Sequence, residues 1–592
     1  MYTASFAFFE ALWEAGVTHV FVNLGSDHPS IMEAMVQGQS QKGSHFPRIV
    51  TCPNEMVALS MADGYARLTN KPQCVIVHVD VGTQALGAAV HNASCGRCPV
   101  LIFAGLSPYT LEGEYRGSRT EFIHWLQDVP DQKQIVSQYC RYAAEIKRGA
   151  NVKQMVNRAL QFATSDPQGP VYLLGSREAM EEDINPYSLN QSYWNRLTPA
   201  ILPQDAVERV AKYLAEAQGP LIVVGYTGRY VDAVTETVKL ADLVPALSVL
   251  DAGGSDMSFP ADHPASLGVR TGRHEAITAA DFILVVDCDV PWVPTQCKPR
   301  DDAKIIHIDV DPLKQQMPLF YINASDRYKA DAALSLKLIR AQVAAHHRPG
   351  VGSQSQFEMR KRQHMERIAQ ADKLAALPSN HNTAINAALL GAQLRQSCPE
   401  DTIYVVEAVT LTQVMADQIR PALPKSWIGS GASGLGWSGG AALGVKLATD
   451  FEQGPGAGRF VCQVVGDGSF MFSVPSSVYW IAARYKIPIL TIVLNNKGWN
   501  APRKSLLLVH PDGQGSRVDN KALNISFDPT PDYSGIAKAA AHGNCWAGCV
   551  NSVEQLIREL PKAVAVVREG SSAVLEVQLD VGRDAVWATA KI

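Results

Sequence analysis

The sequence predicts an α/β protein built from three doubly wound domains, each with a parallel sheet. The first observation is length, because 592 residues exceed what one hydrophobic core supports. The second is that three blocks repeat the same order of apolar strand, turn and helix, which is typical of parallel sheets with helices on both faces. The composition, with 46% hydrophobic and 19% charged residues, is that of an ordinary globular protein.

Apolar runs in each block predict its buried strands. In the first block these runs are residues 17–24, 48–51, 73–79, 100–104 and 171–174. In the second block they are residues 221–224, 282–286 and 305–308. In the third block they are residues 403–406, 459–465, 489–494 and 573–577.

The strand pattern lapses twice, and these lapses divide the chain. Residues 185–203 are polar with scattered prolines, and residues 346–378 hold a Gly/Ser/Gln patch followed by the charged run 358–367. We expect the charged run to form a solvated connecting helix. The predicted units are an N-terminal domain at 1–185, a central domain at 200–345, a linker at 346–379 and a C-terminal domain at 380–592.

Composition also excludes some classes of partner. A formal net charge of −4 gives no general attraction to nucleic acid or to an anionic membrane. No apolar run reaches the roughly 18 to 20 residues that a membrane span requires. Met1 leads directly into an amphipathic pattern, with no basic leader or cleavable apolar segment. We therefore expect a cytoplasmic protein that acts on small molecules and binds neither nucleic acid nor membrane.

Two polar clusters in the third block each follow a predicted strand. They are Gly466-Asp467-Gly468-Ser469 and Asn495-Asn496-Lys497-Gly498. Both lie where parallel strands end, which is where such sheets bind ligands. Asp and Asn oxygens are hard ligands suited to Mg²⁺, and backbone N–H groups at a helix start can bind a phosphate. The two clusters together predict a site for a diphosphate and a metal ion.

With this spacing, the two clusters resemble the thiamine diphosphate motif of the acetohydroxyacid synthase, pyruvate decarboxylase and benzaldehyde lyase superfamily. The resemblance implies that Asp467, Asn496 and the backbone carbonyl of Gly498 bind Mg²⁺. It also implies that Gly468, Ser469 and Asn496 contact the cofactor. In this family the first and third blocks are pyrimidine-binding and diphosphate-binding domains, which would make them distant duplicates.

A second motif lies in the first block. Cys52-Pro-Asn-Glu55, followed by Ala58 and by Ala62-Asp-Gly-Tyr-Ala-Arg67, resembles the pyrimidine-binding motif of the same family. A Glu at a helix start is by itself more often favourable to the helix dipole than catalytic. The resemblance implies that Glu55 bonds to N1′ of the aminopyrimidine and so promotes formation of the C2 ylide, the nucleophile of the cofactor. Many relatives have His just before this glutamate, where this chain has Asn54.

A glycine-rich segment forms the third motif, and it extends from Glu407 to Leu435 and beyond. Its bare backbone suits close approach to a flat ring. The spacing from Glu407 to Leu435 matches pyruvate decarboxylases without a gap. The resemblance implies that Leu435 is the apolar wedge that bends the cofactor. It also implies that Thr410 and Ser433 contact the diphosphate or aminopyrimidine side.

Four residues are candidates for the substrate side of the site. Asp27 matches an aspartate of the decarboxylases, and His28 matches a histidine of benzaldehyde lyase. Gln127 matches a glutamine of the synthases and of benzaldehyde lyase, and it suits a hydrogen bond to a substrate carbonyl or an intermediate hydroxyl. Trp499 also resembles benzaldehyde lyase and is expected to line the substrate pocket.

The central block offers two Gly/Arg segments, residues 225–229 and 268–273, that could meet a nucleotide phosphate. Weak glycine motifs more often form turns, and we favour that interpretation. In acetohydroxyacid synthases this block binds FAD. Their Arg-Phe-Asp-Asp-Arg stretch is replaced here by Asp-Cys-Asp-Val-Pro-Trp at residues 287–292. The resemblance therefore leaves FAD or ADP open without favouring it.

The resemblance implies a thiamine diphosphate- and Mg²⁺-dependent enzyme that makes or breaks a carbon–carbon bond beside a carbonyl, through the ylide and an enamine. Acetolactate synthase-like carboligation of 2-oxo acids is the first interpretation, and benzaldehyde lyase-like cleavage or ligation of 2-hydroxy ketones is the second. Simple decarboxylation is disfavoured, because residues 116–132 lack the decarboxylases' paired histidines and Pro502 stands at the position of their late catalytic glutamate.

Two further classes of function stay open at this point. One is a non-catalytic cofactor-binding or regulatory homologue, and the other is a flavin-dependent 2-oxo acid oxidase. The family builds each active site from Glu55 of one subunit and the Asp467 domain of another. A homodimer or homotetramer is therefore expected.

Overall fold

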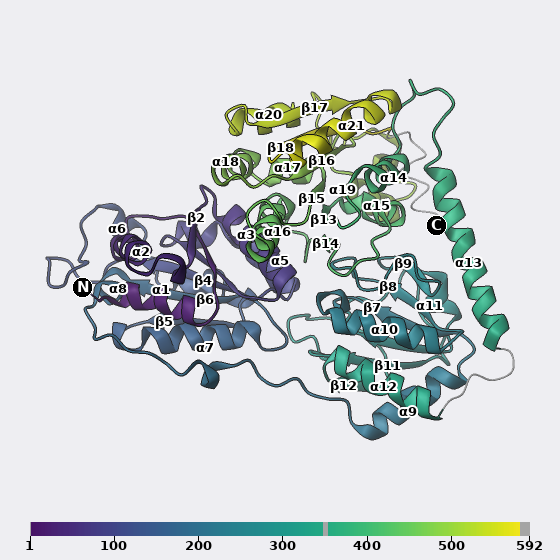
Figure 1. The fold of residues 1–592 in the computed structure, drawn as a ribbon, viewed down its shortest axis with the longest axis horizontal. Helices are drawn as coiled ribbons and strands as arrows, with labels where there is room; N and C mark the ends of the chain where they lie inside the picture. Colours follow the sequence, from purple (N-terminus) through teal and green to yellow (C-terminus); the bar gives the residue numbers. More distant parts are fainter. Residues whose placement is uncertain (1, 347–352, 581–592) are drawn as a thin grey trace.

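Three six-stranded sheets with helices packed on them form the protein (Figure 1). The computed structural model describes residues 2–346 and 353–580. Residues 347–352 of the predicted linker and residues 581–592 of the predicted C-terminal domain lie outside the described residues. Neighbouring strands are parallel throughout the three sheets. The predicted α/β class with three parallel-sheet domains is confirmed, while the domain boundaries stay predictions.

The N-terminal sheet has the strand order β2-β1-β3-β4-β6-β5. Successive strands are added on one side of β1 and then on the other, so the strand order reverses between β1 and β3. Such a reversal opens a crevice at the carboxyl ends of the two strands. The strands are β1 His19–Val22, β2 Arg48–Thr51, β3 Gln73–Val77, β4 Val100–Leu106, β5 Tyr142–Ile146 and β6 Val171–Ser176. The helices are α1 Ala4–Glu14, α2 Pro29–Lys42, α3 Glu55–Thr69, α4 Val81–Gln84, α5 Gly87–Cys95, α6 Ile123–Leu126, α7 Val152–Thr164 and α8 Arg177–Glu181.

The C-terminal sheet has the order β14-β13-β15-β16-β18-β17, which is the N-terminal order again when counted from its own first strand. This shared topology agrees with the expected duplication. The strands are β13 Ile403–Glu407, β14 Trp427–Gly429, β15 Val461–Gly466, β16 Leu490–Asn495, β17 Cys545–Val550 and β18 Ser572–Gln578. The helices are α14 Ala387–Ser397, α15 Thr412–Ile419, α16 Trp437–Gln453, α17 Asp467–Phe472, α18 Pro475–Tyr485, α19 Asn500–Val509, α20 Tyr533–Ala540 and α21 Val553–Arg568.

The central sheet has a different order, β12-β11-β10-β7-β8-β9. Counted from its own first strand, this is the order of dinucleotide-binding folds, with the reversal between β7 and β10. The strands are β7 Pro220–Val224, β8 Ser248–Asp251, β9 Ser266–Val269, β10 Phe282–Val286, β11 Lys304–Asp309 and β12 Asp326–Lys329. The helices are α9 Gln204–Glu216, α10 Val231–Leu243, α11 Glu275–Ala279 and α12 Ala332–His346.

Each strand expected from the sequence is present, and the strands that the sequence did not predict lie at or beside the edges of the sheets. They are β5, β8, β9, β12, β14 and β17. Side chains of β5, β12 and β17 are partly exposed, so these strands lack a continuous apolar run. A half-exposed edge strand gives a weaker hydrophobic signal than a central one.

Helices α3 and α16 cross in close contact and join the N-terminal and C-terminal domains (Figure 1). Three glycines, Gly64, Gly440 and Gly444, lie at the crossing. A Cβ added at Gly440 would stand 2.7 Å from both Ser60 Cβ and the Val57 carbonyl oxygen. The crossing therefore depends on residues without side chains, which let the two backbones approach.

The charged run lies in a single helix, α13 Ser353–Leu374, that runs along the central domain (Figure 1). The expectation of a solvated helix is only partly right, because Arg360 is buried. Its guanidinium donates to the carbonyl oxygens of Ala241, Val244 and Leu247, at 2.9, 3.2 and 3.0 Å. The helix is thus anchored to the carboxyl end of α10.

Candidate active site

The loop that follows β1 carries Asp27 and His28 to the N-terminal crevice, beside the end of β3. Asp27 Oδ2 accepts a hydrogen bond from Val79 N at 3.0 Å, whereas Asp27 Oδ1 is buried with no partner. His28 Nδ1 accepts from Gly25 N at 3.2 Å, and His28 Nε2 lies 3.3 Å from Asp27 Oδ2. Burial raises the pKa of Asp27 to about 6 and lowers the pKa of His28 to about 3. His28 is therefore neutral at pH 7, and Asp27 can exchange a proton near that pH.

Glu55 and His78 face each other at the same crevice. Glu55 begins α3, whose N-cap is Asn54, since the Asn54 side chain accepts from Val57 N at 3.2 Å. His78 follows β3, and its Nε2 lies 3.7 Å from Glu55 Oε1. The His78 side chain is 21% exposed and the Glu55 side chain is 13% exposed, so the pair can be reached from solvent but is largely covered by protein.

The sequence did not single out His78, although it follows a predicted strand directly. Its neighbour Gly25 must be glycine, because a Cβ there would stand 2.5 Å from His78 Cβ and 2.7 Å from Asp27 Oδ1. His78 and Asp27 thus flank one bare backbone position. The useful signal was position alone, since polar side chains after adjacent buried strands meet at one edge of a parallel sheet.

Gln127 directly follows α6, as its C-cap, and its side chain is half-buried. The neighbouring Gln132 is fully enclosed instead and was not singled out by the sequence. It donates to the Gly105 carbonyl oxygen and to Tyr172 Oη, each at 2.9 Å, and accepts from Asp80 N at 2.9 Å. Gln132 therefore braces the loops around the crevice, and a substrate role for Gln127 stays a prediction.

At the C-terminal edge, Asp467, Asn496 and Gly498 come together as expected. Asp467 starts α17, and its carboxylate accepts from Gly468 N at 2.8 Å and from Gly498 N at 2.9 Å. The side-chain oxygen of Asn496 faces Asp467 Oδ1 at 3.3 Å and the Gly498 carbonyl oxygen at 2.9 Å. With the amide turned over, its nitrogen would instead bond to both oxygens.

A carboxylate, a side-chain amide and a backbone carbonyl that lie together suit a hard cation such as Mg²⁺, which binds a few protein oxygens and shares others with a phosphate. Burial raises the pKa of Asp467 to about 6, so its ionised form would gain from a cation beside it. The chemistry of these donors therefore fits the expected metal.

The glycine-rich segment is held by Glu407, which is buried at the end of β13. Its carboxylate accepts from Gly436 N and from Ser438 N, each at 2.8 Å, and burial raises its pKa to about 7. Asn92 of α5 adds two bonds to Gly434, donating to its carbonyl oxygen at 2.7 Å and accepting from its N–H at 3.0 Å. These bonds fix the loop that precedes α16.

The side chains that are expected to contact the cofactor here are half-buried or exposed. Leu435 is half-buried and Ser433 is exposed, while Thr410 is half-buried beside Val409. Val409 has φ of 48°, a conformation that is costly for a β-branched residue. None of the side chains of Leu435, Ser433 and Thr410 is fully buried, so each keeps some surface that a ligand could contact.

Trp499 follows the metal-site loop and lies in an aromatic cluster. Its ring centroid is 6.0 Å from that of Phe472 and 5.0 Å from that of Phe527. The backbone of the returning segment pairs with it, since Trp499 N donates to the Ile525 carbonyl oxygen at 2.9 Å. A substrate-pocket role for Trp499 stays a prediction.

Within the described residues, Glu55 and Asp467 share no hydrogen bond or ion pair, whereas Asn92 of the N-terminal domain bonds twice to Gly434 of the glycine-rich segment. Glu55 pairs with His78, and Asp467 bonds to its own loop. The pyrimidine-side acid and the metal-side acid of one chain thus belong to separate clusters.

The carboxyl edge of the central sheet, where a nucleotide was left open, is acidic. Arg97 of the N-terminal domain pairs there with Asp289 at 2.8 Å and with Asp309 at 3.2 Å. Lys314 also pairs with both aspartates, at 2.6 Å to Asp289. Burial and the charge of Asp309 raise the pKa of Asp287 to about 8. Carboxylates already paired with Arg and Lys argue against a nucleotide phosphate at this edge.

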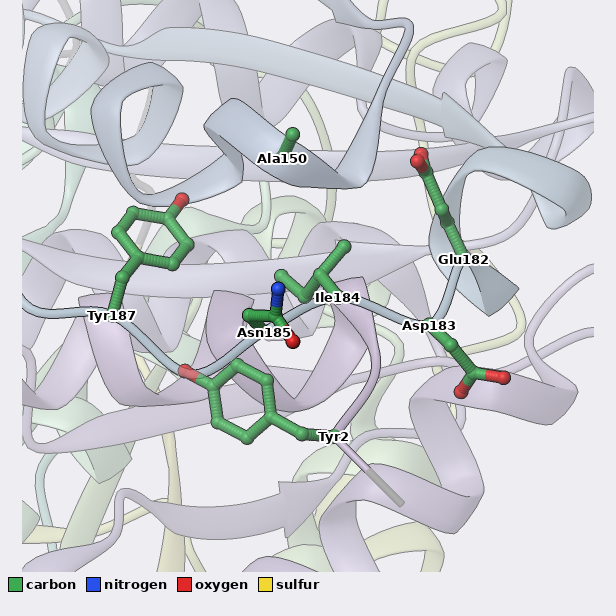
Figure 2. Close-up of a pocket in the computed structure, with 7 residues that line it drawn as sticks. All are labelled: Tyr2, Ala150, Glu182, Asp183, Ile184, Asn185 and Tyr187. Atoms are coloured by element: carbon green, nitrogen blue, oxygen red, sulfur yellow. The ribbon is translucent and has the colours of Figure 1, made fainter.

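A surface hollow of about 530 Å³ lies elsewhere, beside the first residues of the chain (Figure 2). Tyr2 and Tyr187 line it together with the acids Glu182 and Asp183. Those acids already pair with Arg148 and Arg116, at 2.7 and 3.2 Å. We assign the hollow no role in catalysis. Separately, none of the helices in the described ranges has both the length and the apolar character needed to cross a bilayer.

Comparison with known proteins identifies three matching segments. Residues 2–135 match the N-terminal TPP binding domain of thiamine pyrophosphate enzymes, residues 207–317 the central domain, and residues 408–577 the C-terminal TPP binding domain. The matches cover the N-terminal crevice at Asp27 and Glu55 and the metal-site loop at Asp467.

Relatives that are matched over most of their length agree with this. The chain is 26% identical to 2-hydroxyacyl-CoA lyase 2 of Caenorhabditis elegans, over 89% of this chain and 83% of the relative. It is 24% identical to the acetolactate synthase isozyme 3 large subunit of Escherichia coli, over 89% and 87%. The solved benzoylformate decarboxylase of Polynucleobacter necessarius has the same fold, with a TM-score of 0.77 at 20% identity, covering 98% of this chain and 99% of the other.

Proposed function

Because the chain belongs to the thiamine pyrophosphate enzyme family, we propose that it is a thiamine diphosphate- and Mg²⁺-dependent lyase or carboligase acting beside a carbonyl group. The family match supports the cofactor. The metal is supported by the Asn496 side-chain amide, which lies 3.3 Å from Asp467 Oδ1 and 2.9 Å from the Gly498 carbonyl oxygen. When bound, the cofactor supplies a carbon nucleophile and an electron sink.

The chain's own groups have distinct positions around that cofactor. Ser469 would hold its diphosphate, Leu435 would support its bent shape, and Thr410 and Ser433 would contact it, while the Gly468 N–H already donates to Asp467 Oδ1 at 2.8 Å. Glu55 would share a proton with its pyrimidine ring, as an accessible acid at the start of α3. His78, 3.7 Å from Glu55 Oε1, would keep that carboxyl oriented.

The substrate-side groups favour a substrate with a hydroxyl group. Breaking a carbon–carbon bond next to a hydroxylated carbon requires a base to take the hydroxyl proton, whereas loss of CO₂ from a 2-oxo acid does not. Asp27 is the candidate for this base, because its Oδ1 is buried without a partner and its pKa is about 6. This observation carries the assignment. We therefore place cleavage and ligation of 2-hydroxy ketones or 2-hydroxyacyl compounds first.

Acetolactate synthase-like carboligation becomes the second candidate. The acetolactate synthase relative supports it at 24% identity, close to the 26% of the lyase relative, so identity does not separate the two reactions. His28 is neutral and buried, which makes it a partner that positions Asp27 in either reaction.

A second copy of the chain would complete the site. The family match supports this, since related enzymes build each site from the pyrimidine-side acid of one subunit and the metal-side acid of another, the positions of Glu55 and Asp467 here. At least a homodimer follows from the proposal.

The test compares substrates in the presence of Mg²⁺ and thiamine diphosphate. Acetoin, benzoin and a 2-hydroxyacyl thioester are expected to release aldehydes faster than pyruvate yields acetolactate, with products identified by mass. Glu55→Gln should abolish every reaction, whereas Glu33→Gln, an exposed glutamate of α2, should change none. Acetolactate as the dominant product would reverse the order of the two candidates, and full activity of Glu55→Gln would refute the whole mechanism.

A further inference from the structure

The indole nitrogen of Trp499 is a buried donor without a partner. An indole N–H can only donate, and leaving a buried donor unpaired is unfavourable. The indole edge lies over Gly468, where an added Cβ would stand 2.5 Å from Trp499 Nε1. The N–H therefore lies beside the first turn of α17, next to Asp467.

We propose that the indole N–H of Trp499 donates a hydrogen bond to the diphosphate of the bound cofactor. Trp499 would then be a cofactor ligand and not a wall of the substrate pocket. The inference rests on the cofactor part of the proposed function, and it is independent of the substrate.

The position of the indole is firmly held. Phe472 and Phe527 pack against its ring, and its backbone N–H donates to the Ile525 carbonyl oxygen at 2.9 Å. The preceding Gly498 N donates to Asp467 Oδ2 at 2.9 Å, which ties the same loop to the metal-site acid. A ring fixed in this way loses little entropy when it forms one more bond.

The neighbouring groups indicate which acceptor the indole would meet. The backbone N–H of Gly468 already donates to Asp467 Oδ1 at 2.8 Å, so that donor is not free for a phosphate. The indole N–H lies over the same residue and could donate in its place. A diphosphate oxygen is charged, and hydrogen bonds to charged acceptors are the stronger ones.

The inference also explains why Gly468 has no side chain. With any Cβ at this position, the indole would have to move away from α17. The Gly-Asp-Gly cluster and the Asn-Asn cluster would thus be joined by the indole as well as by the metal.

The test measures binding instead of turnover. Calorimetric titrations with Mg²⁺ present would compare thiamine diphosphate, inorganic pyrophosphate and unphosphorylated thiamine. Trp499→Phe should weaken the two phosphorylated ligands about ten- to hundredfold, the loss of one charged hydrogen bond, and leave thiamine unchanged. Phe527→Leu, which disturbs the packing but keeps the N–H, should preserve the affinity ratio of thiamine diphosphate to thiamine.

Three results would overturn the inference. They are wild-type affinity for thiamine diphosphate in Trp499→Phe, an equal loss for thiamine, and the same ratio change in Phe527→Leu. If Trp499→Phe does not fold, Gly468→Ala displaces the indole without removing it and should produce the same selective loss, and an unchanged ratio there would refute the role. A wild type that binds thiamine diphosphate but cleaves no substrate would refute the proposed reaction alone.

Discussion

Gly440→Ala should destabilise the protein, although alanine is the better helix former. The added Cβ would stand 2.7 Å from Ser60 Cβ, 2.7 Å from the Val57 carbonyl oxygen and 3.2 Å from Met61 N. Two of these neighbours are backbone atoms of α3, so the helices must move apart to relieve the contact. Overpacking of this kind costs about 1–3 kcal/mol.

The sign of the effect separates packing from helix propensity. Propensity alone would make alanine more stable than glycine by about 1 kcal/mol. Since about 2–4 °C of melting temperature corresponds to 1 kcal/mol in domains of this size, we expect Gly440→Ala to melt about 2–12 °C lower. Differential scanning fluorimetry at fixed pH, protein concentration and cofactor concentration measures this directly.

Gly87→Ala is the matched control. Gly87 is an exposed glycine at the start of α5, and nothing lies within 4 Å of an added Cβ there. We expect this variant to melt at or slightly above the wild-type temperature. If Gly440→Ala behaved like Gly87→Ala, the α3–α16 crossing would not have the tight contact described above, and the reasoning would be wrong.

Three other substitutions test the electrostatics. Asp467→Asn should weaken Mg²⁺-dependent binding of thiamine diphosphate at least about tenfold, because even outer partners of metal ligands contribute that much; an unchanged Mg²⁺ titration would count against the metal site. The pKa of Glu407 is raised from 4.5 to about 7, so its contribution to stability is present at low pH and lost as pH rises through about 7. The free energy of unfolding should therefore fall by up to about 3 kcal/mol between pH 5 and 8, and Glu407→Gln should remove this fall. If the melting temperatures of the two proteins changed with pH in the same way, the expectation would be contradicted. Arg97→Met should lower the free energy of unfolding by about 3–5 kcal/mol, because Asp289 and Asp309 lose one paired cation. Faster limited proteolysis at the junction of the N-terminal and central domains would report this loss. Resistance equal to that of the wild type would argue against it.

Much of the fold was predictable because buried strands are continuous apolar runs. Residues 282–286, for example, were predicted with the bounds that the buried strand β10 has. The edge strand β12 was not, because its side chains alternate between partly and fully exposed positions. The order of the strands in each sheet also required the structure, since it depends on pairings between distant segments.

The candidate site divides in the same way. Asp467, Asn496 and Gly498 could be placed together because they follow adjacent strands of one sheet. His78 and Gln132 could not be recognised, because their importance comes from contacts with Glu55 and with Gly105 that no spacing reveals. Trp499 was recognised as a residue of the site, but the burial of its N–H over Gly468 appears only in three dimensions.

The sequence alone determined the fold class and the cofactor family, because hydrophobic periodicity and short polar motifs after strands are local properties of the chain. Only the tertiary structure decided which groups meet. It places Asp27, with an unpaired oxygen, near His78, and it places Arg97 and Lys314 at the carboxyl edge of the central sheet. It also places the indole of Trp499 over Gly468. The physical reason is that burial, pKa and pairing depend on neighbours that are distant in sequence and become adjacent only when the sheets and helices pack.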